Sequence, residues 1–159
     1  MLLRADSLAS THAVAAVLAG LARPGDMIAL AGGMGAGKTA FAQGFGQALG
    51  VTEAITSPTF TLVHSYGCGK ITLHHVDLYR LQRMSEVSDL ALAELAEFGG
   101  IVLVEWGDVV SASLGDHLRV RLDFVDGDEG ARLIDVAPSG SSWASRWDRL
   151  SSGLEEWRC

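Results

Sequence analysis

The sequence is poor in several residue types, and each shortage narrows the possible functions. Its 159 residues include no asparagine, two cysteines, two lysines and three prolines. Cys68 and Cys159 lie far apart along the chain, which excludes a disulfide framework and a paired-cysteine zinc motif. We therefore expect two free thiols in a reducing cytosol.

Positive charge is also scarce. Nineteen acidic residues against 12 basic residues give a formal net charge of −7. Lysine and arginine are scattered singly, whereas a protein that binds nucleic acid in bulk carries a basic face or stripe. The composition excludes that class, and any role in a nucleic-acid pathway is expected to depend on partner proteins.

Long hydrophobic runs are missing as well. An unbroken apolar run at residues 13–22 is far shorter than the roughly 20 residues that span a membrane. Its bulky members are spaced as on one face of an amphipathic helix: Val14, Val17, Leu18 and Leu21. Ser10 or Thr11 is expected to cap this helix, and Pro24 to end it. We expect a soluble cytoplasmic protein.

Beyond this helix, short apolar runs alternate with helical and glycine-rich segments. Two runs, 27–31 and 101–105, have the apolar character of parallel strands that are buried on both faces. Turn residues at 67–69 and 126–130 indicate two antiparallel hairpins, formed by 59–66 with 71–77 and by 117–125 with 131–137. Further helices are expected at 38–49 and 85–98.

The predicted fold class is α/β, with a mixed β-sheet flanked by helices on both faces and antiparallel hairpin insertions. Residues 1–140 are expected to form this domain. Residues 141–159 are expected to form a C-terminal tail, with a short helix through Arg149 and a frayed end.

The segment after the strand at 27–31 carries a complete nucleotide-binding motif. Residues 32–39 fit G-x-x-x-x-G-K-[ST] between a predicted strand and a predicted helix, which indicates a P-loop NTPase-type domain. Such a loop directs backbone N–H groups at phosphate oxygens and adds the positive end of a helix dipole. Lys38 is expected to reach the β and γ phosphates, and the Thr39 hydroxyl to bind Mg²⁺. The predicted nucleotide-binding residues of the loop are Gly33, Met34, Gly35, Ala36, Gly37, Lys38 and Thr39.

The lack of asparagine bears on the identity of the nucleotide. P-loop GTPases read guanine with an N/T-K-x-D motif. Lys70, the lysine outside the phosphate loop, is followed by Ile71 and Thr72 rather than by x-Asp. The sequence therefore favours ATP.

Two acidic residues stand at the ends of predicted strands beside the loop. Glu105 follows an apolar run, and Asp77 ends a strand in which alternate residues share one face. One carboxylate could hold Mg²⁺ through water while the other orients or activates the attacking water, and the spacing leaves open which does which. The predicted catalytic residues are Glu105, Asp77 and Lys38.

Neighbouring histidines do not predict a metal site. His74 and His75 point to opposite faces of one strand, so they cannot chelate an ion together. We expect packed or hydrogen-bonded histidines instead. Trp106 follows Glu105, so it lies either at the catalytic edge of the sheet or in the core.

Three further blocks, together with the phosphate loop, resemble one protein family. They occur in the family's order and at its spacing: Ser57-Pro58-Thr59-Phe60-Thr61-Leu62, His75-x-Asp77-Leu78-Tyr79-Arg80-Leu81 and Val104-Glu105-Trp106. From about residue 8 to residue 137, the chain is similar to the TsaE (YjeE) family, the bacterial ATPases of tRNA threonylcarbamoyladenosine biosynthesis.

The resemblance implies a P-loop domain that binds and hydrolyses ATP. Thr39 and Glu105 would bind Mg²⁺, with Asp77 beside them. Three further parts of the chain would lie near the nucleotide: Thr11 and the 126–132 turn at the adenine, and residues 57–62, as a switch-like loop, at the γ-phosphate.

The family also implies partners. Its members support formation of N6-threonylcarbamoyladenosine at position 37 of tRNAs that read codons beginning with adenine. They act with TsaB and TsaD, which carry the transfer chemistry, and the tRNA would be held by these partners. The chain departs from the family at Gly33, where an acid is usual, and at Gly107, where proline is common. Glycine at position 33 leaves the loop more flexible and weakens its organisation of magnesium.

Two other functions fit a phosphate loop. A small-molecule kinase would need a lid with paired arginines, for which Arg80 and Arg83 are the candidates. A nucleotide sensor would bind ATP without meaningful turnover. Adding candidate acceptors to an ATPase assay distinguishes a kinase from an ATPase. The effect of partner proteins on turnover distinguishes an ATPase from a sensor.

Overall fold

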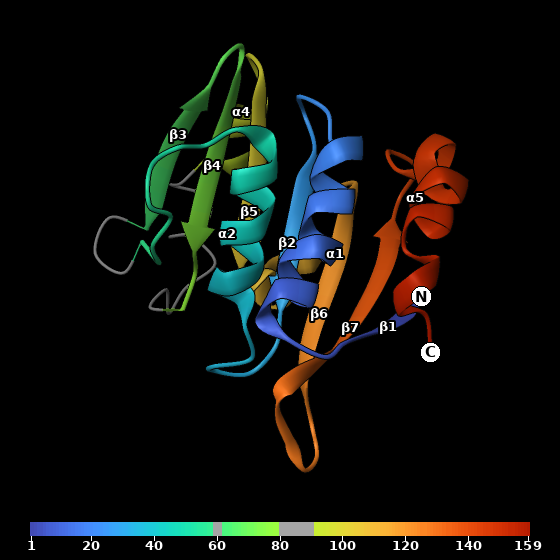
Figure 1. Ribbon diagram of the computed structural model, residues 1–159. Coiled ribbons are helices and arrows are strands. Elements are labelled where there is room, and N and C mark those ends of the chain that lie inside the picture. Colours follow the sequence, from blue (N-terminus) through green and yellow to red (C-terminus); the bar gives the residue numbers. More distant parts are fainter. Residues whose placement is uncertain (59–61, 80–90) are drawn as a thin grey trace.

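A mixed β-sheet runs through the molecule (Figure 1). The structure is a computed structural model that describes residues 1–58, 62–79 and 91–159. In these ranges the sheet has seven strands in the order β1-β7-β6-β2-β5-β4-β3. They are β1 (Leu2–Ala5), β2 (Met27–Ala31), β3 (Val63–Cys68), β4 (Ile71–Asp77), β5 (Gly100–Glu105), β6 (His117–Val125) and β7 (Asp128–Ser139).

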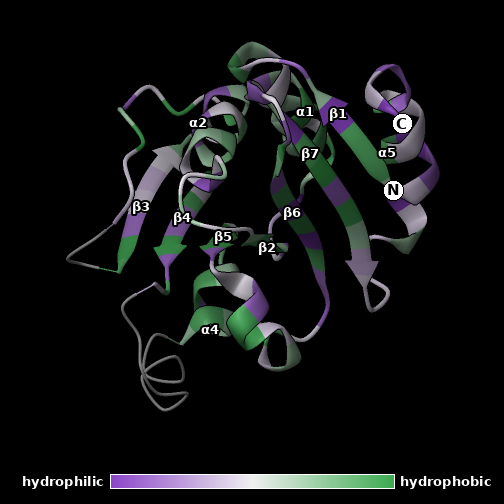
Figure 2. Cartoon of the chain, turned by 90° about the horizontal axis from the view of Figure 1, so that it is seen from below, coloured by the Kyte–Doolittle hydropathy of each residue, from purple (hydrophilic) through white to green (hydrophobic). Residues whose placement is uncertain are grey.

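Helices cover both faces of the sheet, which confirms the predicted α/β fold (Figure 2). α1 (Leu8–Leu21) and α2 (Lys38–Leu49) pack on one face. α4 (Leu92–Ala96) and a 3-10 segment (Gly107–Ser113) pack on the other. Within the described residues, no helix is both long enough and apolar enough to cross a bilayer.

The central strands are buried because their alternate residues enter two different apolar clusters. Ile28 and Leu30 of β2 pack under α1 and α2, whereas Met27 and Ala29 pack on the opposite face. β2, β4, β5 and β6 run parallel, while β1, β3 and β7 pair antiparallel with their neighbours. The carboxyl ends of β2, β4 and β5 therefore meet at one edge of the sheet.

The first helix starts earlier than predicted. Ser7, rather than Ser10 or Thr11, is its N-cap: its backbone is extended, and its hydroxyl oxygen accepts a hydrogen bond from Ser10 N at 3.1 Å. Thr11 lies inside the first turn and is buried. The expected cap was misplaced because the apolar run marks only the part of the helix that follows its first turn.

The sequence pattern does not predict β1. Its residues alternate between exposed and buried, and they pair antiparallel with β7, with Leu3 opposite Ile134 and Ala5 opposite Arg132. Four residues are too few for such a pattern to indicate a strand by itself. The β3–β4 turn also differs from the predicted 67–69, because Gly67 and Cys68 still pair with β4.

Only part of the helix predicted at 85–98 can be compared with the structure, since residues 85–90 lie outside the described ranges. α4 covers Leu92–Ala96. It ends at Glu97, whose backbone is extended, and Phe98 then takes a left-handed conformation with φ of 54°. Phe98 is therefore not helical.

The C-terminal segment differs from the frayed tail that the sequence suggested. α5 (Trp147–Gly153) packs beside α1, the 3-10 turn at Ala144–Arg146 contacts α5, and the 3-10 turn at Glu155–Trp157 contacts α5 and β1. Trp143, Leu150 and Leu154 are fully buried in the same apolar cluster as α1 and β7. Serines and charged residues dominate this segment, but its few large apolar side chains anchor it to the core.

A buried ion pair fixes this segment to the turn before β2. The guanidinium of Arg146 donates to both carboxylate oxygens of Asp26, at 2.6 and 2.8 Å. Both side chains are almost inaccessible to solvent. Arg146 also donates to the carbonyl oxygens of Leu21 and Ser142, and it lies 4.0 Å from the centroid of the Trp143 ring.

Asp26→Ala should lower the free energy of unfolding by about 3–5 kcal/mol, because it leaves the Arg146 charge buried without its counter-charge. Urea denaturation followed by circular dichroism measures this change. Glu155→Ala is the control, since it removes an exposed acid that pairs with Arg158 in the same segment, and it should change stability by less than about 0.5 kcal/mol. Equal small losses in both variants would contradict the anchoring role of Asp26.

Candidate functional site

The phosphate-loop motif joins the carboxyl end of β2 to the start of α2, as the sequence predicts. Gly32 has φ of 135°, and a Cβ at this position would collide with the carbonyl oxygen of Leu122 on β6. Gly37 is the N-cap of α2 in a left-handed conformation, with φ of 105°. By contrast, a Cβ at Gly33 would meet nothing within 4 Å, so the fold does not require glycine there.

Lys38 is folded back over its own loop. Its Nζ donates to the carbonyl oxygens of Gly32 and Gly33 at 2.7 and 2.8 Å. The same atom lies 3.9 Å from the centroid of the Trp106 ring. Burial lowers the pKa of the Lys38 amine, although nearby carboxylates act in the opposite direction. An anion that enters the loop must therefore compete with carbonyl groups for this ammonium.

A chain of three side chains links α2, β5 and β4. Thr39 Oγ1 donates to Glu105 Oε1 at 2.8 Å, and His75 Nε2 donates to the same oxygen at 2.8 Å. His75 is fully buried, and Glu105 is nearly so. Two donors on one carboxylate oxygen fix the orientation of Glu105 and leave its second oxygen outside this chain of contacts.

Strand register places the second predicted carboxylate beside the first. Asp77 of β4 is paired directly with Glu105 of β5. Asp77 Oδ2 accepts a hydrogen bond from Ser57 Oγ at 2.6 Å, and Oδ1 accepts one from the backbone N–H of Tyr79 at 2.9 Å. The structure therefore brings together the two acids that the sequence placed at strand ends, and each has its own set of donors.

Two aromatic side chains form one wall of the site. The ring centroids of Tyr79 and Trp106 are 5.2 Å apart, with the rings tilted by 37°. Trp106 has φ of 61°, a conformation that is rare for a bulky residue and that marks a sharp exit from β5. Gly107 then passes so close to β2 that a Cβ would lie 2.7 Å from Ala29 Cβ. Trp106 thus lies at the site rather than in the core.

These groups line a pocket of about 420 Å³ at the carboxyl edge of the sheet. That volume is in the usual range for sites that bind small molecules. Seven of the predicted site residues line it, and four further residues complete its wall: Met34, Gly35, Gly37, Lys38, Thr39, Asp77 and Glu105, then Ala40, Ser57, Tyr79 and Trp106. Thr11, Gly33 and Ala36 are not among the lining residues.

The oxygen atoms at this pocket suit a magnesium ion. Mg²⁺ prefers oxygen ligands, keeps several waters, and usually takes one or two protein groups together with substrate phosphates. The Thr39 hydroxyl and the Glu105 carboxylate offer such oxygens 2.8 Å apart. No group of three His, Cys, Asp or Glu side chains that could hold a metal occurs among the described residues, so phosphates and water would have to complete the shell.

Some predicted groups lie outside the described residues. They are Thr59, Phe60 and Thr61 of the switch-like loop, and Arg80 and Arg83 of the kinase alternative. At the described start of the 57–62 segment, Ser57 contacts Asp77 and lines the pocket.

Two side chains at the site make contacts that the sequence does not predict, although a packed or hydrogen-bonded His75 and a 126–132 turn at the adenine are expected from it. The contact of His75 with Glu105 had one indirect signal, since strand alternation puts His75 on the same face as Asp77. Arg132 of β7 donates from Nε to the carbonyl oxygen of Ala36 in the phosphate loop, at 2.9 Å. The resemblance implied that the 126–132 turn lies at the adenine, whereas the contact of Arg132 with the phosphate loop is visible only in the tertiary fold.

Comparison with known proteins identifies the family. The family described as Threonylcarbamoyl adenosine biosynthesis protein TsaE matches residues 5–134. The tRNA threonylcarbamoyladenosine biosynthesis protein TsaE of Bacillus subtilis is 43% identical over 142 residues, which are 89% of this chain and 87% of that protein. The protein of the same name from Streptomyces coelicolor is 42% identical over 135 residues, which are 80% of this chain and 90% of that protein.

A solved structure extends the agreement to the fold. The crystal structure of YdiB from Bacillus subtilis matches with a TM-score of 0.74 and 29% sequence identity, and the match covers 98% of this chain and 94% of that one. The sheet with its helices on both faces, the loop between β2 and α2, and these matches lead to one conclusion. The chain has a P-loop NTPase-type fold and belongs to the TsaE family of tRNA threonylcarbamoyladenosine biosynthesis proteins.

Proposed function

We propose that this protein binds ATP with Mg²⁺ and hydrolyses it. Hydrolysis would support formation of N6-threonylcarbamoyladenosine at position 37 of tRNAs that read codons beginning with adenine. The contact between Thr39 and Glu105 carries the proposal, because it joins the hydroxyl of the phosphate loop to the acid at the end of β5. The family supplies the pathway, and the absence of an N/T-K-x-D motif favours ATP over GTP. We place the protein in the cytoplasm, in keeping with its free cysteines.

The phosphate loop would hold the triphosphate. Gly35 and Gly37 let the backbone approach phosphate oxygens, and the N-terminus of α2 contributes its dipole. Lys38 would exchange the carbonyl oxygens of its own loop for anionic oxygens, which are stronger acceptors. Thr39 and Glu105 would hold Mg²⁺, which neutralises phosphate charge when it is bound.

We assign the attacking water to Asp77. Glu105 shares its bound oxygen with Thr39, so its role belongs to the metal, whereas Asp77 lines the pocket without contacting Thr39. The water oxygen bonds to the γ-phosphorus, the bond to the bridging oxygen breaks, and ADP leaves with that electron pair. The water proton passes to the Asp77 carboxylate or to a phosphate oxygen. Ser57 and the Tyr79 N–H hold the carboxylate in position.

We assign tRNA binding and the transfer chemistry to TsaB and TsaD. The chain has a net charge of −7, which opposes direct binding of RNA. Apolar surface is present near the pocket instead: Tyr79 is 52% exposed beside Trp106, and Val109 is 66% exposed three residues further on. This surface borders the phosphate site, so a partner docked there would be sensitive to the nucleotide state.

Glu105→Gln should leave the Kd for ATP within about tenfold of wild type but reduce hydrolysis by at least about a hundredfold, because it alters the metal site and not the phosphate cradle. Lys38→Ala should instead abolish tight ATP binding, since the phosphates lose their counter-charge. Isothermal calorimetry gives the affinities, and ADP release gives the rate.

The two variants test different parts of the proposal. Wild-type hydrolysis by Glu105→Gln would remove Glu105 from the catalytic site. Unchanged ATP affinity in Lys38→Ala would contradict the assignment of the phosphate loop. Tight ATP binding by wild-type protein, with no hydrolysis even when TsaB, TsaD and tRNA are present, would make it a nucleotide sensor.

His75→Leu should lower the single-turnover rate by about 10–100-fold while the Kd for ATP changes less than threefold, because the removed donor orients Glu105 without touching the nucleotide. His75→Gln retains an N–H donor and should recover part of the rate. His74→Leu is the matched control: the adjacent side chain contacts Ser65 on the other face of β4 and should leave the rate unchanged. Equal rates in both leucine variants would show that His75 does not position Glu105.

Full-length protein should bind isolated tRNA weakly or not at all at physiological salt, yet bind a TsaB–TsaD complex clearly. Trp106→Ala should weaken that binding, because the Tyr79–Trp106 surface borders the phosphate site. Pull-downs with labelled tRNA alone, with the partners alone and with both measure these affinities. Tight binding to free tRNA, or no binding to the partners in any nucleotide state, would contradict this role even if ATP binds.

A further inference from the structure

We infer that Arg132 is a positioning residue for the phosphate loop, and that it contacts the loop from outside the pocket. Its guanidinium binds the carbonyl oxygens of Gly35 and Ala36. The N–H of each of these two peptide groups therefore points away from Arg132. The inference rests on the proposed function of this loop in binding phosphate. The sequence motif itself contains no residue with this task.

The guanidinium of Arg132 joins two separate backbone segments. Nε donates to Ala36 O at 2.9 Å, and NH2 donates to Gly35 O at 3.4 Å. On the other side, NH1 donates to Glu129 O and Ala131 O, each at 2.7 Å. One planar group therefore ties the irregular start of β7 to the phosphate loop, and it uses four of the five N–H donors of arginine.

Peptide geometry converts this tie into control of the loop. The carbonyl group of Ala36 and the N–H of Gly37 belong to one planar trans peptide, so they point in opposite directions. A carbonyl oxygen held toward Arg132 turns the Gly37 N–H away from Arg132. Gly37 lines the pocket and is the N-cap of α2, and the N–H groups at a helix N-terminus that lack a partner within the helix bind anions.

The neighbouring peptide group is held in the same manner. The Gly35 carbonyl faces Arg132, and the Ala36 N–H of that peptide donates to Gly33 O at 3.1 Å, which closes a turn within the loop. Gly35 and Gly37 both have positive φ, and because glycine has no side chain, these two residues have no side-chain contacts of their own to restrict their conformation. A flexible glycine-rich loop thus receives part of its shape from a residue on a distant strand.

Arg132 can act as a support because its own backbone is fixed on both sides. It is paired with Ala5 on β1 and with Phe124 on β6. The Phe124 ring also lies under the guanidinium, 4.9 Å from it. Ladder pairing on both edges holds the backbone of Arg132 at the point where the regular pairing of β7 with its two neighbours begins.

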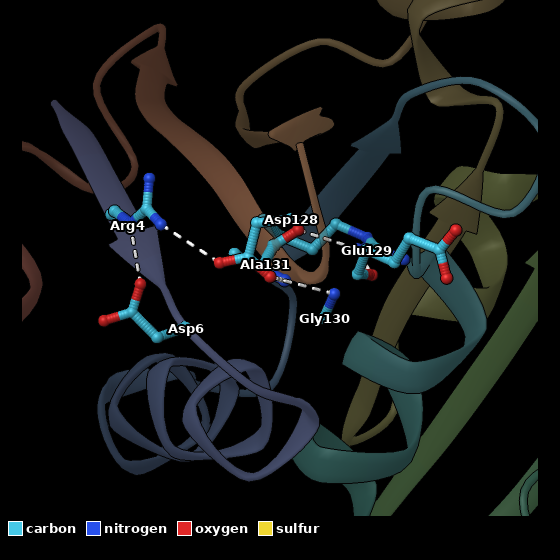
Figure 3. A network of polar contacts seen from close by, with 7 residues as sticks. Arg4, Asp6, Asp128, Glu129, Gly130 and Ala131 are labelled. Carbon is cyan, nitrogen blue, oxygen red and sulfur yellow. Dashed lines mark hydrogen bonds and ion pairs between the residues drawn. The ribbon is translucent and has the colours of Figure 1, made fainter. Parts of the chain in front are cut away.

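The start of β7, which supplies the other two carbonyl groups, is anchored as well (Figure 3). Asp128 Oδ1 accepts hydrogen bonds from the N–H groups of Gly130 and Ala131, each at 3.2 Å. Asp128 Oδ2 accepts one from Arg4 NH2 at 3.2 Å, and Arg4 also pairs with Asp6. The contact between Asp128 and Arg4 connects the start of β7 to β1.

The test compares Arg132→Met with Arg121→Met in the full-length protein. Arg121 lies on β6 and its side chain pairs with exposed Asp123 rather than with a loop carbonyl group, so its variant removes the same charge from the same region. The probes are ATP and inorganic tripolyphosphate, which has no base or sugar, and calorimetry measures both affinities. Hydrogen–deuterium exchange of residues 33–38 in the ligand-free protein reports the loop itself.

Arg132→Met should weaken ATP and tripolyphosphate by the same factor, at least about tenfold, because the lost bonds come from a charged group. Exchange of the ligand-free loop should become faster. Arg132→Lys, which perturbs the fold least, should also weaken both probes, since an ammonium lacks the planar fork that reaches several carbonyl groups. Arg121→Met should change each affinity less than about twofold.

Other outcomes would overturn the inference. A loss of ATP affinity with tripolyphosphate unchanged would place Arg132 at the base or ribose. Weaker binding of both probes without faster exchange in the free loop would mean direct contact with phosphate, and full affinity in Arg132→Lys would mean that charge alone matters. If the wild-type protein binds neither probe, the proposed function itself fails, and the inference fails with it.

Discussion

The site depends on one oxygen atom, Glu105 Oε1, which accepts hydrogen bonds from both α2 and β4. Thr39 is the residue after the phosphate-loop lysine, and His75 comes from the adjacent strand. Glu105 can receive both because β5 is paired on each side, opposite Leu30 of β2 and Asp77 of β4. Parallel pairing with both neighbours leaves the end of β5 almost no freedom. The positions of the loop, the two acids and the buried histidine are therefore fixed relative to one another.

Much of this arrangement can be predicted from short segments of the sequence. The loop between β2 and α2 is encoded by consecutive residues, so its class and its place in the fold follow from residues 27–39 alone. The proximity of Asp77 and Glu105 follows almost as directly, because each ends a strand and parallel strands end at one edge. Their donors are a different matter. Ser57 contacts Asp77 from a segment that precedes β3, and periodicity carries no information about that contact.

Other parts depend on distant pairing and could not be predicted. β1 is recognisable only when β7 lies beside it, and Arg132 is indistinguishable in sequence from any exposed strand arginine. The sequence of the C-terminal segment suggests a frayed tail, because polar residues outnumber apolar residues there. Three buried side chains and the Asp26–Arg146 pair nevertheless hold it to the core. Composition averages over a segment, whereas packing depends on the few side chains that find a partner.

The strand order has a consequence for how this protein is made. β2 and the phosphate loop leave the ribosome early, yet β6 and β7, which support that loop from behind, follow about 80 residues later. β1 must wait even longer for its partner, because the first strand of the chain pairs with the last. A nascent chain that already carries the whole phosphate-loop motif thus still lacks the wall behind it. The phosphate-loop motif is therefore synthesised well before the binding site can form, because the site also needs β6 and β7.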